Sequence, residues 1–242
     1  FDDNTATPVA EGSPSAWVNQ VVQPGAMKLY RFRLPLTAPP AIEVTLRNRV
    51  GKPSMLLKRA ATDAYRYPNE KLDSEMLYSM AADGGYERDY TDTQVINIPY
   101  PPTGDYWLAM GSNDPAISPV PAGGDIEVSV NAPISLAFDG GQDSQVLVKN
   151  QVRYYQVDVP ETLDGLAVSA WRVNADVLSG SVELRVRKGF LPPADTTTKP
   201  VVKSLHNEAV IAQPLLTSGT WYVEVKATAD GTNYTINSVP GR

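Results

Sequence analysis

The chain has 242 residues, of which 42 % are apolar, and its formal net charge at pH 7 is −6. It shows no stripe of Lys and Arg that would neutralise a phosphate backbone, so we expect no nucleic-acid partner. The chain has no cysteine, which excludes disulfides and thiolate metal sites, and no apolar run approaches the roughly 20 residues of a membrane-spanning helix. Because residue 1 is Phe, we expect a processed product or an excised fragment.

Segments that alternate apolar and polar residues dominate the first half of the chain. Residues 1–27 are polar and punctuated by proline, and we expect them to form an arm in which Trp17 packs onto the first module. A helix is expected only as a short element within residues 69–82, where apolar residues recur at rough helical spacing. The strands predicted from alternation are residues 28–34, 42–46, 54–59, 94–98, 105–110 and 125–131.

The second half repeats this series after a connecting segment at residues 132–149. The sequence LYRFRLP, which begins at Leu29, is answered by YYQVDVP from Tyr154, and GDYWLAM from Gly104 is answered by GTWYVEV from Gly219. The preserved order and alternation indicate two copies of an all-β module. The strands predicted in the second copy are residues 153–159, 166–170, 181–187, 208–212, 220–226 and 233–238.

Turn-forming residues separate these strands. The chain contains 21 prolines and 17 glycines, mostly between the strand segments, and short strands joined by turns are typical of antiparallel β-sandwiches. We therefore predict an all-β protein of two tandem antiparallel β-sandwich (jelly-roll-like) domains, residues 1–132 and 133–242. The first domain carries the N-terminal arm and an insertion at residues 60–93, and each domain is long enough to bury its own core.

One stretch of the second half resembles a known family. SVELRVRKGFLPP, at residues 181–193, is a strand that ends in a basic residue and glycine and is followed by a Leu-Pro turn. With YYQVDVP before it and GTWYVEV after it, this stretch resembles the bacterial pre-peptidase C-terminal (PPC) domain. The first copy keeps LYRFRLP, SMLLKR and GDYWLAM but lacks the Gly-Leu-Pro turn. The resemblance covers most of both halves, and its motifs specify packing and turns.

The resemblance implies a β-sandwich accessory module attached to a secreted bacterial peptidase or another extracellular hydrolase. In the clostridial collagenases, related modules bind collagen and calcium through acidic residues at the N-terminal linker, which points here to Asp2, Asp3 and Asn4. The partner implied is an extracellular polymer, either a collagen-like protein or a polysaccharide, or the parent catalytic domain.

Tyrosines and acidic residues gather in the insertion at residues 60–93. A tyrosine offers a flat apolar ring and a hydroxyl, which suits stacking on sugar rings or docking a peptide. The segment is therefore either a ligand-binding loop or an ordered loop whose tyrosines cap the sheet edge. Its candidate ligand-binding residues are Tyr65, Tyr67, Tyr86 and Tyr90.

Two further aromatic residues stand at equivalent places in the two copies. Because side chains alternate along a strand, Tyr106 and Trp221 are expected in the cores, and Trp107 and Tyr222 on the opposite faces. An outward aromatic repeated in both copies either forms a binding platform or is covered by the neighbouring domain or a long loop. The pattern leaves both interpretations open.

The acidic residues of the insertion also form a candidate metal site. Asp83, Asp89 and Asp92 would provide the hard oxygen ligands that calcium prefers, although their spacing fits no EF-hand loop. We therefore predict that no cofactor is required, and keep calcium as a candidate ligand of these three residues.

Catalysis is not expected. The single histidine, His206, cannot form an HExxH zinc site, and no nucleophile elbow or P-loop pattern occurs. A Ser–His–Asp triad assembles in space rather than in sequence, but a surface histidine is the simpler interpretation of His206. The prediction is a non-catalytic accessory or binding region of a larger secreted bacterial protein, which targets an attached hydrolase to a polymeric substrate. The alternative is a structural spacer, or a folding and docking module for the parent enzyme.

Overall fold

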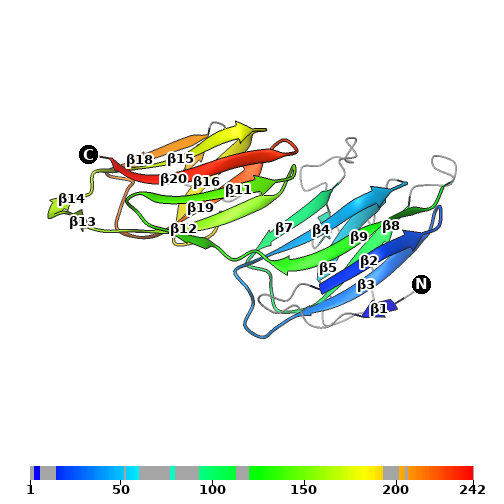
Figure 1. Ribbon diagram of the computed structural model, residues 1–242. Coiled ribbons are helices and arrows are strands. Elements are labelled where there is room, and N and C mark those ends of the chain that lie inside the picture. Colours follow the sequence, from blue (N-terminus) through cyan, green and yellow to red (C-terminus); the bar gives the residue numbers. More distant parts are fainter. Residues whose placement is uncertain are drawn as a thin grey trace. The chain divides into compact units, whose positions relative to one another are not determined.

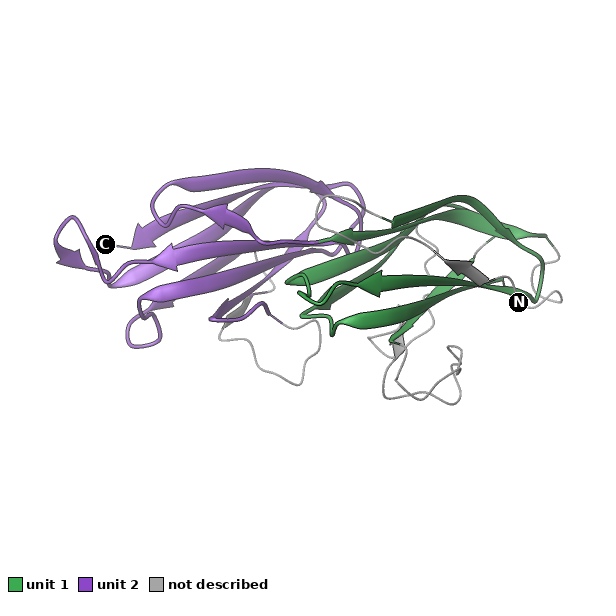
Figure 2. Ribbon diagram, turned by 90° about the horizontal axis from the view of Figure 1, so that it is seen from below, with its two compact units in different colours: residues 1–130 green, residues 131–242 purple. Residues whose placement is uncertain are grey.

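The computed structural model describes residues 3–5, 15–51, 53–59, 77–79, 93–112, 120–192, 202–204 and 207–241. The regular elements of these residues are all β-strands, which confirms the predicted all-β class. The chain divides into two compact units, Phe1–Val130 and Asn131–Arg242 (Figure 2), whereas the predicted boundary followed residue 132. We call them unit 1 and unit 2. The described residues contain no helix that is long and apolar enough to cross a membrane.

Unit 1 is built from a five-stranded and a four-stranded sheet (Figure 1). The five-stranded sheet has the order β1 (Asp3–Thr5), β3 (Met27–Leu34), β8 (Gly104–Gly111), β5 (Ser54–Arg59) and β6 (Leu77–Ser79). The four-stranded sheet has the order β2 (Ser15–Val22), β9 (Ala122–Val130), β4 (Ala41–Val50) and β7 (Gln94–Pro99).

Unit 2 repeats this topology strand for strand. Its five-stranded sheet has the order β10 (Ile134–Leu136), β12 (Val152–Val159), β19 (Gly219–Ala227), β16 (Val182–Lys188) and β17 (Val202–Ser204). Its four-stranded sheet has the order β11 (Gly141–Leu147), β20 (Thr232–Gly241), β15 (Ala170–Ser179) and β18 (Glu208–Ala212). A small hairpin of β13 (Thr162–Leu163) and β14 (Leu166–Ala167) is added in unit 2.

Besides several strands of two or three residues, two longer strands, β2 and β11, appear where the sequence predicted none, because polar residues hide the alternation. β2 lies in the region predicted as a polar arm, and its pairing with β9 shifts between Trp17 and Gln20, which interrupts the period of two. β11 lies in the predicted connecting segment, where Asp143 and Gln145 take the places of apolar side chains on alternate positions. Trp17 does pack as predicted, with its ring centroid 5.1 Å from that of Tyr30.

Two further expectations were wrong. Residues 166–170 are not one strand, because a tight turn at Asp164 and Gly165, both with positive φ, closes a hairpin before β15 begins at Ala170. Within the predicted helix at residues 69–82, the described part is strand β6. The predicted antiparallel pairing is confirmed for the central strands, and each five-stranded sheet adds one parallel pair at its edge, β1 with β3 and β10 with β12.

Each unit has its own apolar core between its two sheets. In unit 1 the β8 core residue Tyr106 donates a hydrogen bond to the Pro102 carbonyl, 2.7 Å away. At the equivalent place in unit 2, the Trp221 indole donates to the Thr217 carbonyl at 2.8 Å. In both units an aromatic side chain thus ties its strand to the carbonyl four residues earlier, as in the tyrosine corner of β-sandwiches.

Candidate binding surfaces

Most of the predicted site residues lie outside the described part of the chain. Asp3 and Asn4 belong to β1, whose backbone pairs with β3. The residues that lie outside the described part of the chain are Asp2, Tyr65, Tyr67, Asp83, Tyr86, Asp89, Tyr90, Asp92 and His206.

Trp107 of unit 1 points away from the core as predicted, while its neighbour Tyr106 is fully buried between the sheets. Its partners across the strands on the outer face are Arg31 on β3 and Lys58 on β5. The Arg31 guanidinium carbon lies 5.6 Å from the Trp107 ring centroid, and Arg31 Nη2 lies 2.9 Å from Asp105 Oδ2. The half-buried Trp107 ring is therefore held by a cation–π contact with an ion-paired arginine.

Tyr222 of unit 2 occupies the equivalent position and is half-buried too. Its partners on the outer face are Gln156 on β12 and Arg187 on β16. The Arg187 guanidinium lies 5.5 Å from the ring centroid of Phe190, whose residue is 58 % exposed. In both units, one aromatic side chain thus lies between two long polar side chains in the same row across the sheet.

The next row of the same outer faces is covered in both units. In unit 1, Leu29 and Ala109 are each 1 % exposed although neither belongs to the inter-sheet core. In unit 2, Tyr154 and Glu224 hold these positions and are 0 % and 1 % exposed. Trp107 and Tyr222 therefore lie one row away from a covered area. They are neither a fully open binding platform nor fully covered, which are the two interpretations that the sequence left open.

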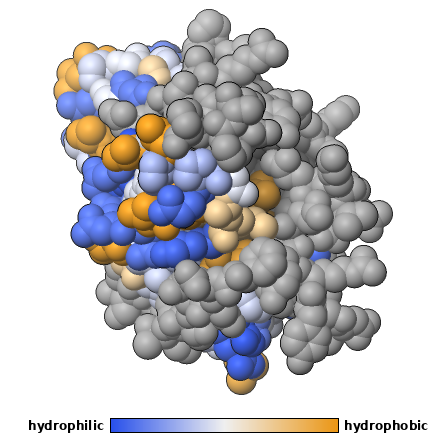
Figure 3. Space-filling view, turned by 90° about the vertical axis from the view of Figure 1, so that its right-hand side faces the viewer, coloured by the Kyte–Doolittle hydropathy of each residue, from blue (hydrophilic) through white to orange (hydrophobic). Residues whose placement is uncertain are grey.

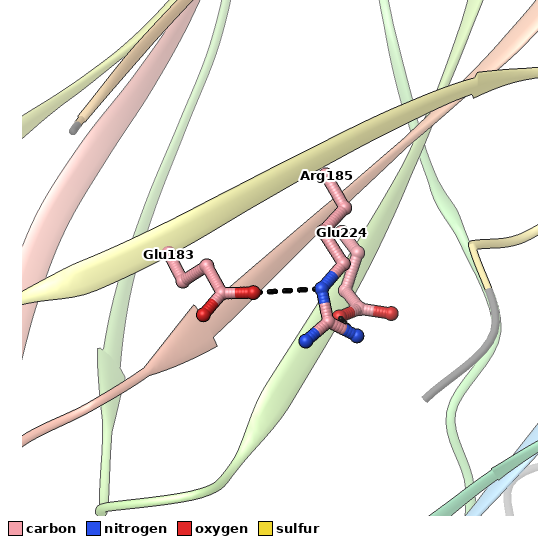
Figure 4. Close-up of polar contacts among 3 residues, drawn as sticks. All are labelled: Glu183, Arg185 and Glu224. Carbon is pink, nitrogen blue, oxygen red and sulfur yellow. Dashed lines mark hydrogen bonds and ion pairs between the residues drawn. The ribbon is translucent and has the colours of Figure 1, made fainter. Parts of the chain in front are cut away.

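The covered row of unit 2 contains a cluster of charges (Figure 4). Arg185 of β16 donates through Nε to Glu183 Oε1 at 2.7 Å, and its Nη1 lies 3.3 Å from Glu224 Oε1. The side chains are 10 %, 14 % and 2 % exposed for Arg185, Glu183 and Glu224. Alternation along β16 and β19 predicted these residues to face away from the core, but it carries no information on whether that face is solvated.

Burial by itself lowers the pKa of Arg185, but the charge of Glu224 outweighs this together with the hydrogen bond and charge of Glu183, and the net pKa is raised. Arg185 therefore stays protonated and serves as the counter-ion of two carboxylates. The ion pair with Glu224 connects β16 to the neighbouring strand β19.

A second polar cluster lies at the edge of the unit 2 core. The Tyr155 hydroxyl donates to Asp143 Oδ2 at 3.0 Å and lies 2.9 Å from the Tyr234 hydroxyl. Burial raises the pKa of Tyr155 and of Tyr234 above its usual range, with Tyr234 and Asp143 adding to the effect on Tyr155. Both hydroxyls remain protonated at neutral pH, so the cluster bridges the two sheets. In unit 1 the Tyr30 hydroxyl makes the equivalent contact with Gln20.

A pocket of ≈ 290 Å³ opens between the end of β12 and the β18–β19 connection. Its apolar wall includes Val159, Val168 and Leu216, and its polar rim includes Gln213 and Thr217. Gln213 already donates a side-chain hydrogen bond to the Val168 carbonyl at 2.8 Å. This volume lies at the lower end of small-molecule sites, about 300–1,000 Å³.

Exposed apolar side chains occur on both units. Leu36, in the β3–β4 connection, is 94 % exposed, and Leu166 of β14 is 75 % exposed. On the side of the molecule shown in Figure 3, hydrophilic and hydrophobic residues are interleaved over the described surface. Single exposed apolar residues are ordinary on a protein surface and mark no site by themselves.

No family model and no curated protein matches the chain. Among solved structures, the periplasmic g-type lysozyme inhibitor PliG of Aeromonas hydrophila is matched over 45 % of this chain and 96 % of its own length, at 10 % identity and a TM-score of 0.32. Tripeptidyl peptidase 2 is matched over 98 % of this chain and 24 % of its own length, at 7 % identity and a TM-score of 0.32. A β-porphyranase of Bacteroides plebeius is matched over 96 % of this chain and 35 % of its own length, at 9 % identity and a TM-score of 0.24. Matches this weak assign neither a family nor an activity.

Proposed function

We propose that the chain is a non-catalytic accessory region of a larger secreted bacterial protein, in which two PPC-like β-sandwiches hold an attached hydrolase on a polymeric substrate. The observation that carries this proposal is the repeated outward aromatic, Trp107 in unit 1 and Tyr222 in unit 2, each flanked by long polar side chains on rigid neighbouring strands. Aromatic rings on a rigid surface stack on sugars or peptides with little loss of side-chain entropy.

The duplication itself supports a polymer as the ligand. A repetitive ligand offers the same feature many times, so that two weak sites on one chain act through effective concentration and bind more tightly than either alone. An attached enzyme is then kept near its substrate without any contribution of the modules to chemistry.

Two titratable groups of unit 2 have structural roles. Arg185 neutralises two carboxylates, and Asp143 accepts a hydrogen bond from Tyr155. Groups occupied in this way support a binding role over a catalytic one.

Retention of the whole chain on insoluble collagen, cellulose, chitin and other polysaccharides tests the proposal. We expect retention on at least one polymer and a loss of about tenfold in affinity for Trp107→Ala or Tyr222→Ala, since truncating an aromatic anchor of a binding surface costs about 1–2 kcal/mol or more. Tyr100→Ala is the matched control, because Tyr100 is 49 % exposed and lies in the β7–β8 connection, outside both rows. Absence of retention on every polymer would refute the proposal.

The alternative is a spacer or docking module for the parent enzyme, and the half-burial of Trp107 and Tyr222 is the observation that favours it. In that case the chain would show no retention on polymers, and its presence would raise the thermal stability of the attached catalytic domain. Calcium bound by Asp83, Asp89 and Asp92 is compatible with either function.

A further inference from the structure

The outer face of the four-stranded sheet of unit 2 carries a set of polar side chains that none of the functions above uses. On β15, β18 and β20 these residues alternate with core residues, on β11 they alternate with half-buried ones, and all of them are exposed or half-buried. The strand register aligns them in two rows across the sheet. We call this set the polar face; the first row is Gln142, Asn237, Asn174 and Glu208, and the second row is Ser144, Thr235 and Asp176.

Internal hydrogen bonds hold the centre of the polar face in a fixed arrangement. The Asp176 carboxylate accepts from the side-chain amides of both Asn174 and Asn237, the latter at 2.8 Å. The hydroxyls of Ser144 and Thr235 lie 2.8 Å apart on neighbouring strands. Because the two asparagines donate to Asp176, their side-chain oxygens point elsewhere, and among the described residues these oxygens accept no hydrogen bond. The face is therefore organised before any ligand arrives, which lowers the entropic cost of binding.

The corresponding face of unit 1 is closed over the rows of Glu43 and Thr45. Thr45 on β4 takes the place that Asn174 takes on β15, and Thr45 is 2 % exposed. Glu43, one row away, is 3 % exposed, whereas the equivalent Arg172 is exposed. In the second row Arg47 stands where Asp176 stands in unit 2, and its side chain is 47 % exposed and lies 3.9 Å from Glu127. The two copies share their strand order but present different side chains on this face.

The chemistry of the polar face selects a ligand. An apolar peptide would bury the side-chain oxygens of Asn174 and Asn237 without hydrogen-bond donors, at a cost of about 1–3 kcal/mol each. Two carboxylates, Asp176 and Glu208, face a single guanidinium, Arg172, so that the face repels polyanions such as sulfated or uronic polymers. A neutral ligand rich in hydroxyl groups satisfies both conditions. Exposed aliphatic residues at the margins, Val146 and Val210, suit the apolar ring faces of sugars.

We propose that the polar face of unit 2 binds a neutral polysaccharide whose extended chain runs across the strands. Neighbouring strands are about 4.7–4.9 Å apart, close to the length of one sugar in an extended β-linked chain, so each strand meets one sugar residue. This inference rests on the proposed function and deepens it, because it names the class of polymer and adds a second surface to the aromatic rows.

The test uses the whole chain and three neutral probes, cellohexaose, chitohexaose and laminarihexaose, with binding measured by isothermal calorimetry and by chemical-shift changes in ¹⁵N spectra. We expect binding of at least one probe, shift changes on β11, β15 and β20, and a loss of about tenfold in affinity for the double variant Asn174→Ala/Asn237→Ala. Binding should change little between low and high salt, because no ion pairs form with a neutral ligand. Thr235→Val is a second variant that keeps the β-branched shape and removes only the hydroxyl. Thr162→Ala, in the β13–β14 hairpin, is the matched control.

The outcomes separate this inference from the proposed function. Binding of a probe that is unchanged in both the asparagine and the threonine variants, or shift changes confined to the rows of Trp107 and Tyr222, would overturn the polar face as a site while leaving the polymer-binding function intact. Retention on collagen or heparin without binding of any neutral oligosaccharide would also overturn it. Failure to bind every polymer and every oligosaccharide would overturn both.

Discussion

Replacing Arg185 with Met is expected to destabilise unit 2 by about 3 kcal/mol. The substitution keeps a long side chain that can fill the same space but removes the counter-ion of Glu183 and Glu224. These two carboxylates are 14 % and 2 % exposed, so that the second in particular has little access to water once the guanidinium is gone.

The magnitude follows from the geometry. Two unit charges at the 3.3 Å separation of Arg185 Nη1 and Glu224 Oε1 attract each other by about 5 kcal/mol at an effective dielectric constant of about 20. Desolvation of the three charged groups offsets part of this attraction, and removing one partner of a buried ion pair typically costs about 3–5 kcal/mol. The lower end applies here because Glu183 is more exposed than Glu224 and can turn towards water.

Urea unfolding followed by tryptophan fluorescence measures the effect. In the background Trp17→Phe/Trp107→Phe the remaining tryptophans are Trp171 and Trp221, both in unit 2. With a slope of about 1–3 kcal/mol per molar urea, a loss of 3 kcal/mol lowers the midpoint by about 1–3 M. Adding Glu224→Gln to the variant should restore part of the stability, because it removes the charge that has lost its counter-ion.

Arg187→Met is the control, because Arg187 lies on the same strand and the same face, one row away, and stacks on the exposed Phe190. Its loss should stay below about 1 kcal/mol. Equal losses of less than 1 kcal/mol for both arginines would refute the reasoning, since they would mean that the charges of the cluster are as well solvated as those at an open surface.

Three further results are expected. The hydrogen bond from the Asn19 backbone amide, and next that from the Asn48 side chain, lowers the pKa of Asp125. The stability lost in Asp125→Ala at pH 7 should therefore disappear as the pH falls below about 4 and the carboxylate is protonated. Urea unfolding from pH 7 to 3 measures this loss of stability, and a loss that stays the same at every pH would contradict the prediction. Ser238→Ala removes the buried acceptor of the Trp171 indole, 2.9 Å away, and should cost about 1–3 kcal/mol in urea unfolding; an unchanged midpoint would show that water replaces it. Excess calcium should raise the melting temperature over that in chelator, whereas coincident curves would remove the calcium proposal.

The inner faces of the sheets were predictable from the sequence, because burial between two sheets imposes a period of two on the apolar residues. Tyr106 and Leu108 of unit 1, and Trp221 and Val223 of unit 2, are buried as their alternation predicted. The strands that were missed break the same rule in identifiable ways. β2 contains a bulge, at which the positive φ of Asn19 is supported by Asp125, and β11 turns Asp143 towards the core.

The outer faces were not predictable, because alternation says which residues share a face but not what lies over it. Glu43 and Thr45 were expected to face solvent opposite a buried face, and they are 3 % and 2 % exposed. The charges of Arg185 and Glu224 are buried in the same way. The polar face could not be predicted for a different reason. Its rows depend on the pairing of β11, β15 and β20, and the sequence did not predict β11 as a strand.

The covered rows of the two units show why the charged residues of such a cluster occur together. In unit 1 the covered row consists of Leu29, Ala109 and Leu56, and in unit 2 the same row consists of Tyr154, Glu224 and Arg185. A glutamate placed alone in the covered row would bury a charge without a counter-ion at a cost of several kcal/mol, and an arginine alone would do the same. The two charged residues are therefore stable only together, so that the row can be entirely uncharged or can hold an ion pair, and each unit contains one of these two solutions. The strand order survives this exchange because the inner faces, which determine the core, are independent of it.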